Sequence, residues 1–196
     1  MRRRLLVIPS AFVIVVLALT GCASGANVVP GAGDEDRIAP VQPSESSAGV
    51  AGDAAALAQA QAWLDAANLP PGAVRTDTSP GDFNSYTGWP CGPYEQSEGF
   101  WVIPDTTVVD AANWLIENPT ADLVTTNFAP ATEERGPVDS AVVGYIPAPG
   151  AQEGIVYTLA KKEGDVAIRA EVAAQTDPAS CPPLPDGSTY GAPGQG

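Results

Sequence analysis

Two alternating segments near the C-terminal end constrain the fold of this 196-residue chain more than any other feature. The segments, 154–161 and 166–172, are rich in the β-branched and aromatic residues that favour strands. One face of the second segment carries Val166, Ile168, Ala170 and Val172, and the other carries Ala167, Arg169 and Glu171. The turn between the segments, 162–165, has Gly164 where a positive φ is needed. The sequence therefore predicts an antiparallel hairpin.

Two helices are predicted before this hairpin. The first starts at Asp53 as its N-cap and ends before Pro70, because proline has no amide hydrogen. The second starts at Thr107 and ends at Asn118, and Asp110 completes a capping box in place of the usual Glu. The spacing of small and apolar residues gives each helix one buried face, formed by Leu57, Ala60, Leu64 and Ala67 in the first and by Val108, Ala111, Ala112 and Leu115 in the second.

Strands are also expected over 99–104 and 138–146. The order of helix, strand, helix and three strands indicates an α+β fold, in which an antiparallel sheet of about four strands has both helices packed on one face. We expect a single domain over residues 53–181, with an irregular loop over 75–94. The tail, 182–196, is rich in Gly and Pro and is expected to be disordered.

The first 22 residues have the layout of an export signal. Arg2–Arg4 precede a mostly apolar run, 5–19, which is short for a membrane-spanning helix of about 20 residues. The run leads into Leu19-Thr20-Gly21-Cys22, which resembles the lipobox of bacterial lipoproteins. This resemblance implies a signal peptide over 1–21, cleavage before Cys22 and acylation of that cysteine, with palmitate among the acyl chains. The alternatives are an uncleaved signal anchor and secretion without lipid.

Acylation would attach the protein to the membrane, because each buried methylene contributes about 0.8 kcal/mol and two chains anchor stably. Residues 22–52 have the composition of a flexible tether. We interpret the acidic triplet 34–36 as solvated linker charge, with a weak calcium site as the alternative. Cleavage removes three arginines and leaves 6 basic and 23 acidic residues. This large negative net charge opposes binding to nucleic acid, and it also opposes contact of the protein surface with anionic lipid.

The two remaining cysteines, Cys91 and Cys181, form an even pair in an exported chain and are predicted to form a disulfide. The bond would close a loop of about 90 residues, which contributes roughly 4–5 kcal/mol in the chain-entropy description. Neither cysteine belongs to a Cys-x-x-Cys pair, so a redox role is not indicated.

The chain carries few signs of catalysis. It has no histidine, which excludes histidine triads and histidine-bound zinc, and no P-loop, GxSxG or SxxK motif. Asp77, Asp82, Glu95 and Glu98 are the carboxylates best placed for a glycosidase pair, although solvated surface acids are the simpler interpretation. We expect no catalytic residue, no metal and no cofactor.

Aromatic residues gather around Cys91. Six lie within 19 residues, namely Phe83, Tyr86, Trp89, Tyr94, Phe100 and Trp101. Aromatic loops bind sugars and peptides, and Trp and Tyr are frequent at binding hot spots. The candidate ligand-binding residues are therefore Tyr86, Trp89, Tyr94 and Trp101. Coverage of a core edge is the alternative role for this cluster.

One further resemblance extends over about residues 53–174. It depends on Leu69-Pro70-Pro71-Gly72-Ala73, on 100–104, on a helix reaching Leu115 and on 166–171. These segments resemble a group of uncharacterised actinobacterial proteins, a resemblance that implies no activity. We expect a lipid-anchored protein on the extracytoplasmic face of the cell membrane, with a binding or structural role towards an envelope protein or glycan. A carboxylate-dependent hydrolase acting on envelope glycan is the alternative, and a metal-dependent module is a third.

Overall fold

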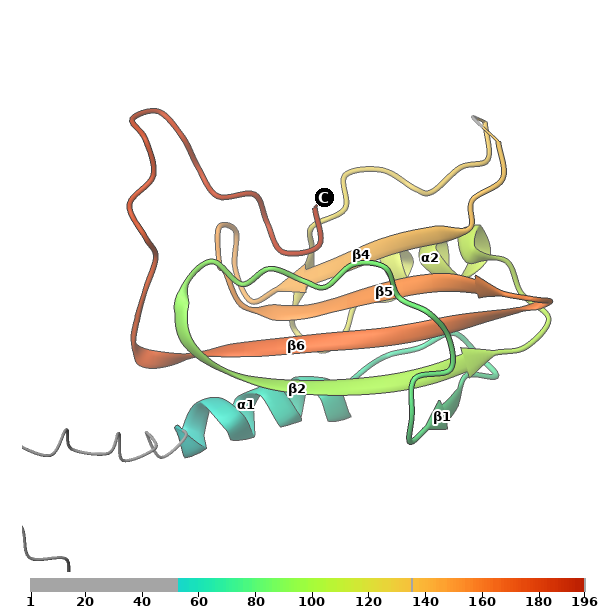
Figure 1. Cartoon of the computed structure of the whole chain (residues 1–196), viewed down its shortest axis with the longest axis horizontal. Coiled ribbons are helices and arrows are strands. Elements are labelled where there is room, and N and C mark those ends of the chain that lie inside the picture. Colours follow the sequence, from blue (N-terminus) through green and yellow to red (C-terminus); the bar gives the residue numbers. More distant parts are fainter. Residues whose placement is uncertain (1–52, 135, 196) are drawn as a thin grey trace, which may run out of the picture. The chain divides into compact units, whose positions relative to one another are not determined.

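The computed structural model describes residues 53–134 and 136–195, which form an α+β fold around one antiparallel sheet (Figure 1). The sheet has six strands in the order β1-β2-β6-β5-β4-β3. Their bounds are β1 Val74–Thr76, β2 Gly92–Ile103, β3 Val124–Thr125, β4 Ser140–Ile146, β5 Gly154–Lys162 and β6 Asp165–Ser180. The expected count of about four strands is corrected to six. The two additional strands, β1 and β3, are the short strands at the two edges of the sheet.

The hairpin predicted from the alternating segments is present as β5 and β6. Its register pairs Ile155 with Val172 and Leu159 with Ile168. The two residues of the turn are Glu163 and Gly164, and the positive φ falls on Glu163 (53°) instead of on the glycine, which corrects the expected turn.

Strands β2 and β6 are longer than the sequence predicts, because each supplies the partner that the other requires. The expected strand at 99–104 begins at Gly92, within the segment expected to be an irregular loop. The expected strand at 166–172 continues to Ser180. The polar first half of β2 pairs with the second half of β6, from Tyr94↔Gln175 to Ser97↔Val172. Backbone pairing thus compensates for a weak apolar pattern.

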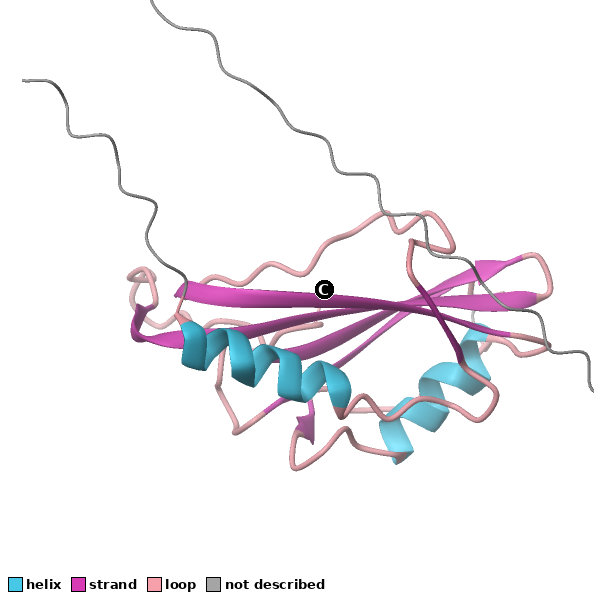
Figure 2. Cartoon of the chain, turned by 90° about the horizontal axis from the view of Figure 1, so that it is seen from below, coloured by secondary structure: helices cyan, strands magenta, loops and turns pink. Residues whose placement is uncertain are grey.

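Both helices pack on the same face of the sheet (Figure 2). Helix α1, Ala54–Asp65, is capped by the Asp53 carboxylate, which accepts hydrogen bonds from Ala55 N (3.0 Å) and Ala56 N (3.1 Å). Helix α2, Val108–Glu117, starts at the predicted cap Thr107, and its predicted apolar face is buried. In α1 the buried residues are Ala56, Ala60 and Leu64, whereas Leu57 is exposed, so the predicted face is rotated.

The helix-side core is dense and contains two buried tyrosines. Tyr145 donates to Leu115 O, and the Tyr157 and Thr120 hydroxyls lie 2.6 Å apart. The two rings meet edge to face, with centroids 6.2 Å apart. Trp101 lies in the same core. No helix within residues 53–134 and 136–195 is long and apolar enough to cross a bilayer.

The opposite face of the sheet, called here the open face, is crossed by two chain segments without regular structure (Figure 1). The loop segment, 77–91, connects β1 to β2, and the tail segment, 182–195, follows β6. The sequence predicts disorder for the tail, but in the structure residues 191–195 lie against the sheet. Thr126 Oγ1 donates to Pro193 O (3.1 Å), and the Gln195 side chain donates to Thr126 O.

Candidate functional site

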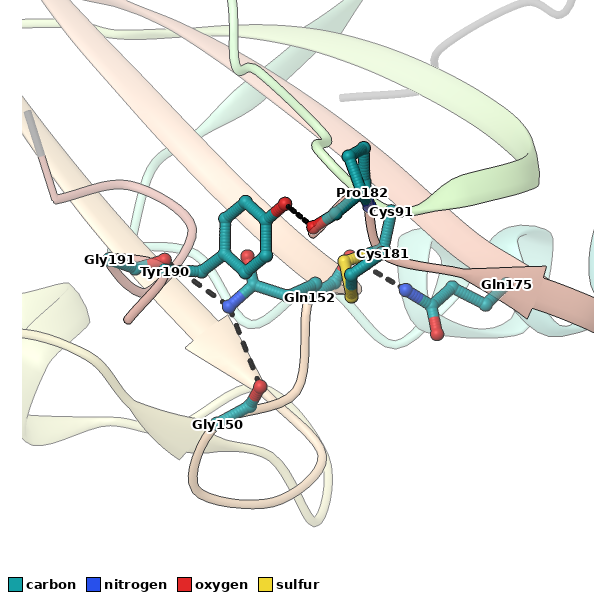
Figure 3. Close-up of a disulfide and its surroundings, with 8 residues drawn as sticks. All are labelled: Cys91, Gly150, Gln152, Gln175, Cys181, Pro182, Tyr190 and Gly191. Carbon is teal, nitrogen blue, oxygen red and sulfur yellow. Dashed lines mark hydrogen bonds between the residues drawn. A yellow bond between two sulfur atoms is a disulfide. The ribbon is translucent and has the colours of Figure 1, made fainter. Parts of the chain in front are cut away.

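The loop and tail segments are joined by a disulfide. Cys91 ends the loop segment and Cys181 precedes the tail segment, and the two are bonded to each other as predicted (Figure 3). The two segments therefore diverge from one covalent point and run over the open face of the sheet. The space between them is the candidate functional site.

This space is a groove of about 550 Å³. The sheet supplies its floor through Val142, Val156 and Thr158, while 85–90 and 190–195 supply its walls. A second hollow of about 560 Å³ continues from it along the tail segment, and Gln152 and Tyr190 line both. Among the residues that the structure describes, none of those lining the groove is charged. An uncharged groove with an apolar floor suits a neutral ligand, because a charged one would lose its hydration without a counter-charge.

Two buried polar atoms on side chains that line the groove have no hydrogen-bond partner among the described residues: Trp89 Nε1 and Gln152 Oε1. Trp89 is only 8% exposed and Gln152 only 6%. The orientation of the Gln152 amide follows from its neighbours, because its nitrogen lies 3.4 Å from Gly150 O and 3.2 Å from Gly191 O (Figure 3). Both partners are acceptors, so the nitrogen faces them and the oxygen is left without a donor. The side chains that line the groove thus include one unused donor and one unused acceptor.

A buried arginine fixes the loop segment to the sheet. Arg169 of β6 is 2% exposed, and its Nη2 lies 2.8 Å from Glu171 Oε2 and donates to Ser85 O. Glu171 in turn accepts from the backbone nitrogen (3.1 Å) and hydroxyl (3.0 Å) of Thr87. The guanidinium also lies 4.4 Å from the centre of the Tyr86 ring. These contacts position the wall that carries Trp89.

A polar pocket of about 920 Å³ lies on the other side of Tyr86. Its lining includes Asp82, Glu98, Arg169 and the rings of Phe83 and Phe100. Glu98 Oε1 is 3.9 Å from Arg169 Nε, which has no hydrogen-bond partner within 53–134 and 136–195. Burial raises the pKa of Glu98, the positive charge of Arg169 opposes that rise, and the negative charge of Glu171 adds to it. The pocket differs from the groove in carrying charge.

Three of the four predicted binding residues lie on the open face. Tyr86 is 79% exposed and lines both the groove and the polar pocket. Trp89 lies in the groove wall, and Tyr94 packs against the small cluster that Trp89 forms with Val156. Trp101 lies on the helix side of the sheet, buried in the core and beneath the guanidinium of Arg75 at 5.4 Å. The sequence allows two roles for the aromatic cluster, ligand binding and coverage of the core. Trp101 has the second role.

The four carboxylates considered for a glycosidase pair do not all lie in one place. Asp82 and Glu98 line the same pocket. Glu95 instead accepts a hydrogen bond from Asp53 N (2.9 Å) at the start of α1, and Asp77 lies in the loop segment. No group of three potential metal-ligating side chains occurs in the part of the chain that the structure describes. Cys22 and the acidic triplet 34–36 lie outside the described residues.

Several site residues were not singled out from sequence: Thr126, Gln152, Arg169, Glu171 and Tyr190. For Arg169 and Glu171 a signal exists, since charged residues two apart in an otherwise apolar strand share a face and, if buried, must pair. For Thr126, Gln152 and Tyr190 the sequence carries no comparable signal, because they gain their role from the path of the tail segment.

A comparison of the chain with protein-family models, with curated proteins and with solved structures finds no match. The functional argument therefore depends on the geometry of the open face.

Proposed function

We propose that the chain is a lipid-anchored protein of the extracytoplasmic envelope that binds a neutral ligand in the groove of its open face. The candidate ligands are an envelope glycan and a peptide segment of an envelope protein. The observation that carries the proposal is a pair of unpartnered atoms, Trp89 Nε1 and Gln152 Oε1, on two side chains that line one uncharged groove and are each more than nine-tenths buried. Buried polar groups are ordinarily paired, so a donor and an acceptor left free together support a ligand that would use both.

Titration of the purified protein with soluble glycan fragments and with uncharged peptides tests this proposal. We expect a saturable heat of binding, measured by isothermal titration calorimetry, with one of the two classes. Trp89→Phe keeps an aromatic ring but removes the N–H, and should weaken binding about tenfold, the equivalent of one hydrogen bond. Trp114→Phe, on the helix side, is the matched control. Equal affinities of Trp89→Phe and native protein would contradict the proposal.

Membrane attachment is tested separately. The lipobox resemblance supports acylation of Cys22, so Cys22→Ser should move the protein from the membrane fraction to the soluble fraction. Intact-mass measurement of the native protein should give a chain that starts at Cys22 and carries two or three acyl groups. A chain that keeps residues 1–21, or a free thiol at Cys22, would disprove this part of the proposal.

A second candidate is the carboxylate-dependent hydrolase, because Asp82 and Glu98 line one pocket and burial raises the pKa of Glu98. A raised pKa suits a general acid, and glycosidases pair such an acid with a second carboxylate. Hydrolysis of envelope glycan by the native protein, lost in Glu98→Gln and in Asp82→Asn, would support this candidate. Turnover that survives both substitutions would rule it out.

A further inference from the structure

The bound part of the tail segment is a β-turn over 192–195, with Pro193 and Gly194 at its centre, closed by the hydrogen bond that Gln195 N donates to Ala192 O (3.0 Å). Gly191 O accepts a hydrogen bond from Gln152 Nε2 (3.2 Å), and Pro193 O accepts one from Thr126 Oγ1 (3.1 Å). Pro193 is the only residue of 182–195 that is buried, whereas residues 181–189 are exposed. The tail is therefore held at its last few residues and is otherwise free of the sheet.

A notch in β4 receives this peptide. Gly144 lies directly under the tail, and a Cβ at this position would overlap with Pro193 O and would lie 2.5 Å from Thr126 Oγ1. Gly194 has a φ of +81°, and a Cβ there would lie 3.1 Å from Gly144 Cα. The two backbones meet because neither glycine has a side chain. The notch fits a proline followed by glycine.

The tail does not satisfy the whole site. With the tail in place, Trp89 Nε1 and Gln152 Oε1 remain buried without partners. Such unpaired groups are unfavourable, so a peptide that also pairs with them would be a better occupant than the tail. An identical tail from a second copy would make the same contacts. It could not outcompete the attached tail, which has the advantage of a high effective concentration.

We infer that the notch and groove bind an uncharged peptide with a Pro-Gly turn, supplied by a partner protein, and that the tail segment occupies the site until the partner displaces it. This inference rests on the proposed function and narrows its ligand to a peptide. The disulfide at Cys181 and the exposed residues 182–189 keep a displaced tail attached beside the site. Because the groove is uncharged, binding should depend little on ionic strength.

The test uses the full chain and a labelled synthetic peptide with the sequence of residues 190–196, followed by fluorescence anisotropy. Pro193→Ser weakens the attached tail and leaves the notch intact, so it should bind the peptide at least about tenfold more tightly than native protein does. The peptide with alanine in place of proline should bind at least about tenfold more weakly. Gly144→Ala in the Pro193→Ser background should abolish binding. Gly164→Ala, where a Cβ meets nothing within 4 Å, is the matched control.

Equal affinity for the native protein and Pro193→Ser, or for the proline and alanine peptides, overturns the inference. The second comparison does not depend on how Gly144→Ala folds. Dimers of Pro193→Ser or native protein that form through the tail with increasing concentration would assign the site to a second copy and overturn the partner assignment. Glycan fragments that bind the groove, with no binding of the peptide, would reject the peptide ligand and leave the proposed function standing.

Discussion

Arg169 shows how one buried charge organises the open face. It stands between two acids of the same face, since Glu98 and Glu171 are direct cross-strand partners in β2 and β6. Like charges opposite each other destabilise a sheet, and a guanidinium between them offsets that repulsion. The same side chain holds Ser85 and the Tyr86 ring. A single residue thus links the sheet, both acids and the wall of the groove.

Removing this charge should be costly. Arg169→Met leaves Glu171 buried without its cation, and we expect the free energy of unfolding to fall by about 3–5 kcal/mol. Urea denaturation followed by circular dichroism measures the change. Lys161→Met is the control, because Lys161 pairs with Asp139 at the surface (3.2 Å), and exposed pairs contribute about 0–1 kcal/mol. Equal effects of the two substitutions would contradict the role assigned to Arg169.

Ionisation of Tyr145 should make the free energy of unfolding depend on pH in the alkaline range. Burial raises the pKa of Tyr145 from 10.0 to about 12, so the unfolded chain ionises first as the pH rises. The stability that the neutral hydroxyl contributes is complete below pH 10 and should be lost between about pH 10 and pH 12. Tyr145→Phe should show a shallower fall of the unfolding free energy over this window, measured by urea denaturation at several pH values. Parallel pH profiles would refute the prediction.

At the scale of the elements, the start of α1 is held from two sides. Asp53 caps the helix through its carboxylate, and its backbone nitrogen donates to Glu95 of β2 (2.9 Å). Asp53→Ala should lower the free energy of unfolding by about 0.5–2 kcal/mol, whereas Asp53→Asn keeps a capping oxygen and should cost much less. Thermal unfolding of the three proteins provides the comparison, and an alanine variant as stable as the asparagine variant would argue against the cap.

The elements found from sequence are those whose signal is local. Alternation specifies β5 and the first half of β6, and the capping pattern with a 3.6-residue period specifies α2. The edge strands β1 and β3 have two or three residues each and exist through pairing with β2 and β4. The first half of β2 is polar and depends on β6 in the same way. The groove draws on four stretches distant in sequence, 85–90, 142, 152–158 and 190–195, which no local pattern connects.

For the whole molecule, the Cys91–Cys181 bond is the main long-range constraint, since it spans a sequence separation of 90. Replacing both cysteines with serine should lower the free energy of unfolding by roughly 2–5 kcal/mol. Urea denaturation of the double variant, and of native protein with and without reductant, checks this. Reduced native protein should match the double variant. An unchanged urea midpoint after reduction would contradict the prediction.

The central position of β6 has a consequence for how this protein can evolve. Residues 166–174 are all buried, because the helices cover one side of the strand and the loop segment helps to cover the other. A strand enclosed on both sides has no position at which a side chain can vary freely in size or polarity. Saturation mutagenesis should therefore find few tolerated replacements across these nine positions, while the edge strand β1, largely solvent-facing, should accept many.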